Sequence, residues 1–117
     1  MSRINQDFTM WAGETQRLVV TVYDCDDEVM DITGSSISWI MQASILQGDP
    51  AIVKTTDDPA EIEITDGENG EFAIYLLPED TENMGGWFYH EALLVDADDN
   101  ESVVVTGRAR INASVHD

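Results

Sequence analysis

The sequence predicts an all-β protein, a single antiparallel β-sandwich of seven to nine strands. Three observations predict it. Apolar residues alternate with polar ones along most of the chain, which is typical of half-buried strands. Turn-forming residues separate these alternating segments at short intervals. No segment of helix length repeats its apolar residues about every 3.6 positions, so the short strands must form two packed sheets.

The length predicts one domain. The chain has 117 residues, of which 43% are hydrophobic, and this is enough material for one core. No linker or repeat divides it. We therefore expect residues 1–117 to form a single β-sandwich domain.

Four strands are expected in the first half of the chain. The acidic run at residues 24–28 is expected to be a turn, because its four carboxylates would repel each other within a ladder. The segment at residues 47–50 breaks the chain with Gly and Pro. Around these turns, alternation predicts strands at residues 7–11, 18–23, 36–42 and, as a brief edge strand, 52–53.

Four more strands are expected in the second half. The glycines of residues 66–70 favour a turn, and Pro78 ends the strand that follows it. Residues 79–86 are expected to form a crossover with one helical turn, and residues 96–100 a hairpin turn. Alternation predicts the strands at residues 61–64, 72–77, 87–95 and 103–111.

The shared phase of the alternation predicts the core. The residues expected to be buried are Leu18, Val20, Val22, Ile37, Trp39, Phe72, Ile74, Leu76, Phe88 and Leu94. His90 lies on the same strand face as Phe88. It is therefore interpreted as a histidine at the edge of the core and not as a general base.

The charge excludes several classes of function. The chain has 24 Asp and Glu against 5 Lys and Arg, a formal net charge of −19, which disfavours binding to nucleic acid or to an anionic membrane. The N-terminus lacks the apolar stretch of a signal peptide, so we expect synthesis in a cytoplasm. Cys25 stands alone and cannot form an internal disulfide. No catalytic motif is found, so we predict a protein that is not an enzyme and needs no cofactor.

Short motifs follow one another in a characteristic order. They are Gly13-Glu14-Thr15, Asp31-Ile32-Thr33-Gly34, Glu79-Asp80-Thr81 before Gly85, Gly86-Trp87-Phe88-Tyr89-His90-Glu91 and Gly107-Arg108-Ala109-Arg110-Ile111. In this order, residues 7–111 resemble a family of small phage virion proteins that includes the baseplate upper proteins. Phe88 and Ala109 depart from the family's usual Tyr and larger apolar residue, and the loop at residues 46–59 is long for it.

The resemblance implies an immunoglobulin-like domain in a virion and no catalytic site. Its expected partners are other virion proteins and further copies of the chain, so that the protein is a homo-oligomer in the particle. A place in the tail, neck or baseplate is preferred. A capsid decoration protein of the same fold, or a module that binds carbohydrate or a receptor through exposed aromatic residues, remains an alternative.

Some of these motif residues have structural roles that do not depend on the family. Asp31 and Thr33 can hydrogen-bond nearby backbone N–H groups, and Gly34 permits the turn into the next strand. Gly86 lets the chain leave the crossover and enter the sheet.

One outer face of the sandwich is unusually apolar. If Phe88, His90 and Leu94 point inward, their neighbours on the same strand point outward. An apolar face on a highly charged domain is typical of a docking surface. Two alternatives are open: the long loop at residues 46–59 covers this face, or an offset of one residue turns Trp87 and Tyr89 inward. The predicted partner-binding residues are Trp87, Tyr89, Ile40, Leu93, Val104 and, on the outer side of the first strand, Trp11.

Two acidic tips raise the question of calcium. Asp24 and Asp26 in one turn, and Asp96 and Asp98 in the other, place carboxylates at alternate positions, as calcium loops do. The two tips are expected at the same end of the sandwich, where they could converge. Both lack the glycine of a tight cation loop, and carboxylates run through the whole chain. The acidic residues are therefore interpreted as a charged surface, and no metal is predicted.

Overall fold

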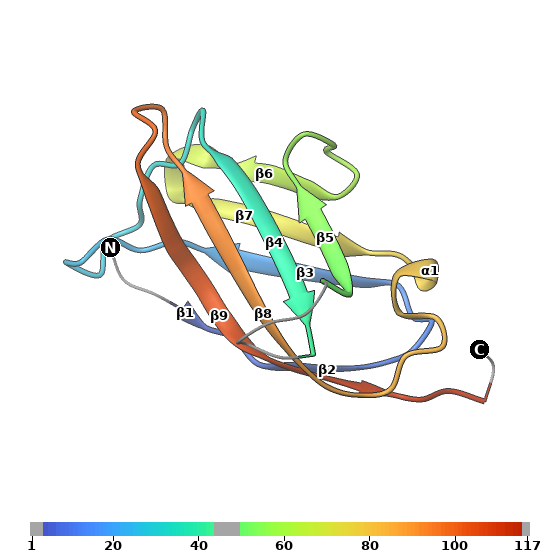
Figure 1. Cartoon of the computed structure of the whole chain (residues 1–117). Helices are drawn as coiled ribbons and strands as arrows, with labels where there is room; N and C mark the ends of the chain where they lie inside the picture. The colour runs from blue at the N-terminus through green and yellow to red at the C-terminus, as the bar shows by residue number, and fades with distance from the viewer. Residues whose placement is uncertain (1–3, 44–49, 116–117) are drawn as a thin grey trace.

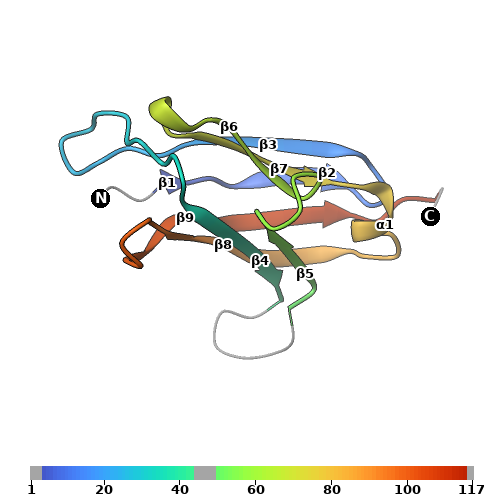
Figure 2. The same ribbon diagram turned by 90° about the horizontal axis from the view of Figure 1, so that it is seen from above.

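The structure is a computed structural model that describes residues 4–43 and 50–115. The chain break predicted at residues 47–50 lies, except for Pro50, outside the described residues. The described part contains two β-sheets packed face to face, with the core between them (Figures 1 and 2). The predicted all-β sandwich is therefore confirmed.

The larger sheet has six strands in the order β1-β9-β8-β4-β5, with β2 also paired to β9. The smaller sheet has three strands in the order β3-β7-β6. The strands of the larger sheet are β1 (Ile4–Asn5), β2 (Phe8–Trp11), β4 (Ser36–Gln42), β5 (Ile52–Thr55), β8 (Gly86–Val95) and β9 (Glu101–Asn112). Those of the smaller sheet are β3 (Gln16–Thr21), β6 (Ile62–Asp66) and β7 (Glu71–Leu76).

Two short helical segments connect the strands. The 3-10 helix η1 (Gly67–Asn69) joins β6 to β7, and the helical turn α1 (Pro78–Thr81) lies in the crossover from β7 to β8, as the sequence predicts. The carboxylate of Asp80 accepts a hydrogen bond from the Leu77 backbone N–H at 2.7 Å, which stabilises the start of α1. None of the helices in the described part is both long and apolar enough to cross a membrane.

The core contains nearly all of the residues predicted for it. Trp39 and Phe72 are the largest of its fully buried side chains. Phe88 is the exception, because it is only half-buried and packs against the edge of the core. The predicted residues that are buried are Leu18, Val20, Val22, Ile37, Trp39, Phe72, Ile74, Leu76 and Leu94.

The N-terminal segment forms two short strands where the sequence predicts one. Both β1 and β2 run parallel to β9, whereas the other strand pairs are antiparallel. The chain bends between them at Gln6 and Asp7, opposite Gly107. There the Asp7 carboxylate replaces a backbone acceptor and takes a hydrogen bond from the Arg108 N–H at 2.8 Å. At this edge the pairing is therefore parallel and departs from the antiparallel pairing that the sequence predicts.

A β-bulge in β9 overturns the prediction for Val104. Ala92 pairs with Val105 and Leu93 pairs with Val103, so Val104 has no partner and the alternation of side chains slips by one residue. Val104 is fully buried, at 0% exposure, and Val105 beside it is buried as well. Val104 therefore belongs to the core and not to the outer face.

The edge strand β5 is tied to the crossover by a buried ion pair. Lys54 Nζ lies 2.7 Å from Asp80 Oδ2, and the two side chains are only 6% and 18% exposed. A lysine buries its charge only where a partner compensates it. This contact joins the far edge of the larger sheet to α1.

The turn motif before β4 has the structure that its residues predict. Asp31 Oδ1 accepts a hydrogen bond from the Thr33 N–H at 2.9 Å. The hydrogen bond of the Thr33 side chain, and after it this backbone bond, lowers the pKa of the Asp31 carboxyl. Gly34 has a φ of 79°, in the left-handed region, and Gly86 a φ of 111° at the start of β8.

Candidate docking surface

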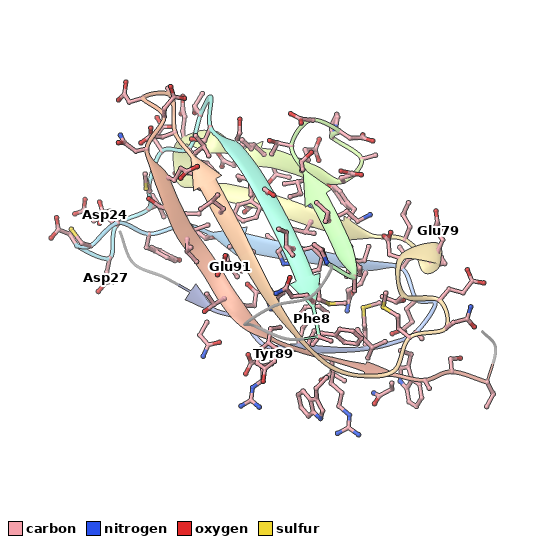
Figure 3. The ribbon with its side chains drawn as sticks, in the orientation of Figure 1. Phe8, Asp24, Asp27, Glu79, Tyr89 and Glu91 are labelled. Atoms are coloured by element: carbon pink, nitrogen blue, oxygen red, sulfur yellow. The ribbon has the colours of Figure 1, made fainter. Side chains whose placement is uncertain are left out.

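The outer face of β8 is exposed and aromatic. Trp87 is 57% exposed and Tyr89 36% exposed, and Glu91 follows them on the same side of the strand (Figure 3). The alternative offset, with the two aromatic rings inward, is therefore wrong. Their inward neighbour His90 is buried at 4% exposure, in agreement with its prediction as a histidine at the edge of the core.

Other predicted residues share this side of the larger sheet. Ile40 on β4 pairs with Glu91, and both Ile40 and Leu93 are partly exposed. Trp11 on β2 is 54% exposed and pairs with Asn112, next to the inward-facing pair of Met10 and Ile111. We call this side, with Trp11, Trp87, Tyr89, Ile40 and Leu93, the outer face.

The described part of the long loop continues the larger sheet at its edge. Residues 52–55 form β5, which pairs with β4 and continues the sheet sideways. Residues 46–49 of the same loop lie outside the described residues. The part of the loop that the structure describes therefore extends the outer face at its edge.

Two arginines flank Trp87. Arg110 on β9 pairs with Trp87 on β8, and Arg108 pairs with Tyr89, the next outward-facing residue of β8. The guanidinium carbons of Arg108 and Arg110 lie 5.9 and 5.4 Å from the centroid of the indole ring, within the range of cation–π attraction. We call this group of Arg108, Trp87 and Arg110 the Arg–Trp cluster.

The Arg–Trp cluster is the main positive feature of the described surface. Arg17 lies over Tyr75 on the other sheet, and Lys54 is buried with Asp80. Within residues 4–43 and 50–115 that Lys54–Asp80 contact is the single ion pair, so no described carboxylate lies within 4.0 Å of either cluster arginine. The two guanidinium groups can therefore receive anionic groups from outside.

A shallow groove runs beside Tyr89. It has a volume of about 430 Å³ and is lined by polar groups such as Asp7, Gln42, Glu91 and Arg108 together with the Tyr89 ring. The groove opens on the outer face, because Ile40, Tyr89 and Glu91, which line it, lie on that face. Its mixture of an aromatic ring and hydrogen-bonding groups suits a polar ligand.

His90 holds the sheet together beneath this groove. Its Nδ1 accepts a hydrogen bond from the Trp39 indole N–H at 3.1 Å, and its Nε2 lies 2.6 Å from the Gln6 carbonyl oxygen. Because a carbonyl can only accept, Nε2 carries the proton and the ring is neutral. Burial lowers the pKa of His90, against smaller opposing effects of the Gln6 hydrogen bond and the Asp7 charge.

The two acidic tips have the same turn structure. Asp24 Oδ1 accepts the N–H groups of Asp26 and Glu28, at 2.8 and 3.1 Å. Asp96 Oδ1 does the same for Asn100 and Asp98, both at 2.9 Å, and the bond from Asn100, followed by that from Asp98, lowers the pKa of Asp96. The first carboxylate of each tip therefore stabilises its own loop.

The structure does not bring the acidic tips together as a metal site. In the described ranges, no group of three or more His, Cys, Asp or Glu side chains is placed to hold a metal ion. Each tip instead has an aspartate in the left-handed region, Asp27 with a φ of 62° and Asp99 with a φ of 63°. The missing glycine is visible in the sequence, but the aspartate that takes its left-handed conformation is not predicted from it.

Sequence reasoning also missed the Arg–Trp cluster. Arg108 and Arg110 stand at alternate positions, a spacing that places both on one face of a strand. Their position around Trp87 depends on the register between β8 and β9, which the alternation alone does not give.

Comparison with known proteins adds no family: no protein-family model matches the chain, and no curated protein matches it significantly.

Proposed function

We propose that this chain is a non-enzymatic structural component of a bacteriophage virion, which docks through its outer face onto itself and other virion proteins. The observation that supports this most is the pair of exposed rings, Trp87 and Tyr89, beside the Arg–Trp cluster. On a domain with a net charge of −19, this is where apolar area and positive charge coincide. Aromatic residues and arginines are enriched in protein interfaces.

An immunoglobulin-like topology fits the strand order. In such domains one sheet contains the third, sixth and seventh strands and the other contains the second, fifth and fourth. Setting β1 and β2 together as the first strand, the orders β9-β8-β4 and β3-β7-β6 have this arrangement, with β5 added beside β4. The agreement supports the resemblance from which the virion setting is inferred.

A non-enzymatic role is supported by the contacts of His90, the histidine within the described residues. Both ring nitrogens of His90 are engaged, one by Trp39 and one by Gln6. A general base needs a nitrogen that faces the substrate, so His90 is a structural residue.

Incorporation into particles tests the proposal. A phage lacking this gene is complemented with the wild-type chain or with a Trp87→Ser, Tyr89→Ser double variant. We expect the double variant to fold, shown by far-UV circular dichroism, and to be missing from purified particles. The matched control is Val19→Ser with Leu77→Ser, since each of these residues is 41% exposed and neither belongs to the outer face. Normal incorporation of the Trp87/Tyr89 variant would show that the protein docks elsewhere.

The placement within the virion is the next question. The resemblance favours the tail, neck or baseplate over the capsid surface, where a decoration protein of the same fold would lie. An electron-microscopic map of particles that carry a tagged copy of this chain distinguishes these positions. Density for the tag on the capsid surface would favour decoration.

A receptor- or carbohydrate-binding module is the second candidate. The groove beside Tyr89 favours it, because sugars stack on aromatic rings while polar groups bind their hydroxyls. A glycan array probed with the wild type and with Tyr89→Ser separates the two candidates. Glycan binding that depends on Tyr89 would favour the second, and its absence leaves assembly as the better account.

A further inference from the structure

We infer that the outer face binds the acidic tip of a second copy of this chain, so that copies associate head to tail. The Arg–Trp cluster of one copy receives the carboxylates of the turn at residues 24–28 of the next. This inference rests on the proposed function, because it names one partner of the same docking surface. It is carried by charge complementarity between two ends of one molecule.

The receiving end is prepared for carboxylates. The Trp87 ring holds the two guanidinium groups, at 5.9 and 5.4 Å, on the same face of the sheet. Arg110 Nε is oriented further by a hydrogen bond to Asn112 Oδ1 at 3.2 Å. An arginine that is already oriented loses less conformational freedom on binding a carboxylate, and its planar group matches both oxygens.

The donating end is the loop between β3 and β4. Asp24 and Asp27 mark this loop in Figure 3, and Figures 1 and 2 both show it projecting beyond the sandwich. Asp26, Asp27 and Glu28 are exposed in it, while the Asp24 carboxylate holds the loop in a defined shape. A rigid, projecting and strongly acidic tip suits a pair of preoriented arginines.

The two ends lie far apart on an elongated molecule. The domain measures 44 × 28 × 23 Å. The acidic loop projects at the end where β8 finishes, whereas the Arg–Trp cluster lies where β8 begins (Figure 1). A contact between different surfaces of identical copies is heterologous, and it produces a ring if the rotation closes and a filament if it does not.

The contact is expected to be weak between free copies. Exposed ion pairs contribute little each, and two copies with a charge of −19 repel. Raising the salt from about 0.02 M to 0.15 M should strengthen association by screening the repulsion, and about 1 M should weaken it by screening the ion pairs. In a ring or on a particle, the many simultaneous contacts make the assembly stable.

Sedimentation equilibrium of the full chain tests the inference. Between about 10 µM and 1 mM protein, we expect reversible association of the wild type. Arg108→Gln with Arg110→Gln should weaken it about tenfold or more. Arg17→Glu, which lowers the net charge by the same two units, is the matched control and should associate as the wild type does.

Charge reversal at the tips provides the second arm. Asp26→Lys with Glu28→Lys should abolish association, although it reduces the overall repulsion between copies. Asp98→Lys with Glu101→Lys changes the net charge equally in the other hairpin, and it should leave association at least as strong as in the wild type. Equal effects of the two variants would overturn the assignment to residues 24–28.

Mixing two deficient variants tests the head-to-tail arrangement itself. The Arg108/Arg110 variant retains its acidic tip, and the Asp26/Glu28 variant retains its Arg–Trp cluster. An equimolar mixture should therefore form 1:1 dimers that grow no further. A mixture that stays monomeric, or a wild type that is monomeric at 1 mM, would overturn the inference. The proposed function would then still stand if Trp87 and Tyr89 were needed for incorporation into particles, with another virion protein as the partner.

Discussion

The indole N–H of Trp39 donates a hydrogen bond to Nδ1 of His90 across 3.1 Å, between β4 and β8. On the other side of its ring, His90 Nε2 donates a hydrogen bond to the Gln6 carbonyl oxygen at 2.6 Å. Three segments of the larger sheet are joined in this way by one neutral imidazole. Protonation would place a second donor opposite the indole N–H, so this arrangement requires the neutral ring.

His90 should therefore make the domain less stable as the pH is lowered. Its pKa in the folded state is lowered from the ordinary value of 6.5, so the unfolded chain takes up a proton first as the pH falls. The contribution of His90 is complete above 6.5 and is lost as the pH falls from there toward the folded-state pKa. Urea unfolding at several pH values, compared with His90→Gln, isolates this effect from the titration of the carboxylates. An identical pH dependence in both proteins would contradict it.

Gly107→Ala should destabilise the N-terminal edge of the larger sheet. A Cβ at Gly107 would overlap the Gln6 carbonyl and lie 2.8 Å from His90 Nε2. Because the obstacle is backbone, we expect a loss of about 1–3 kcal/mol in urea unfolding. Gly85→Ala is the control, since its Cβ would meet only the Ala113 side chain at an ordinary 3.5 Å. Equal stability of the two variants would show that β1 moves aside without cost.

Glycine at the left-handed positions of the tips should stabilise the fold. Asp27 and Asp99 adopt φ values of 62° and 63°, where a side chain costs about 1 kcal/mol that glycine avoids. We expect Asp27→Gly and Asp99→Gly to be more stable than the wild type in thermal unfolding. The alanine variants remove the same charge and retain the Cβ. If alanine stabilises as much as glycine, the gain comes from reduced repulsion alone.

Breaking the buried ion pair from one side should be costly. Lys54→Met leaves the Asp80 carboxylate, 18% exposed, without its lysine, and we expect a loss of about 3 kcal/mol. Adding Asp80→Asn removes the uncompensated charge and still leaves an acceptor for the Leu77 N–H. The double variant should regain most of the loss in urea unfolding. Additive losses would mean that the lysine stabilises β5 by packing and not by its charge.

Salt should stabilise the domain without any need for calcium. Monovalent salt screens the repulsion within a domain of charge −19, so sodium chloride alone should raise the Tm. Millimolar calcium should add little once abundant sodium chloride is present. A saturable effect of calcium that survives high salt, and that is lost in Asp26→Asn or Asp98→Asn, would indicate a specific site.

The alternation of side chains was sufficient to predict the strands other than β1 and most of the core. Each strand buries one face, so the phase of Leu18 or Ile74 identifies the inward side without knowledge of its partner. Val104 fails this rule because a bulge depends on the pairing of two strands. The burial of Lys54 could not be predicted from alternation either, since the compensating carboxylate of Asp80 is distant in the sequence.

The candidate surface likewise contains some features that the sequence predicts and others that it does not. The outward direction of Trp87, Tyr89 and Trp11 follows from local alternation, and all three side chains are exposed in the structure. The two arginines around Trp87 could not be found without the register of β8 on β9. The close approach of Gln6 to Gly107 was equally hidden, because a missing side chain gives no sign of what occupies its space.

The parallel pairing of the N-terminal strands with β9 determines how the domain would bear tension. Because β1 and β2 run in the same direction as β9, the chain enters this edge of the sheet at one end and leaves it at the other. A pull on the two ends of the chain would slide β2 along β9 and strain their hydrogen bonds together, in shear, instead of opening them one after another. Rupture under such a load is governed by the rate of unfolding. A chain anchored at both ends would thus be joined through the part of the sheet that resists being drawn apart.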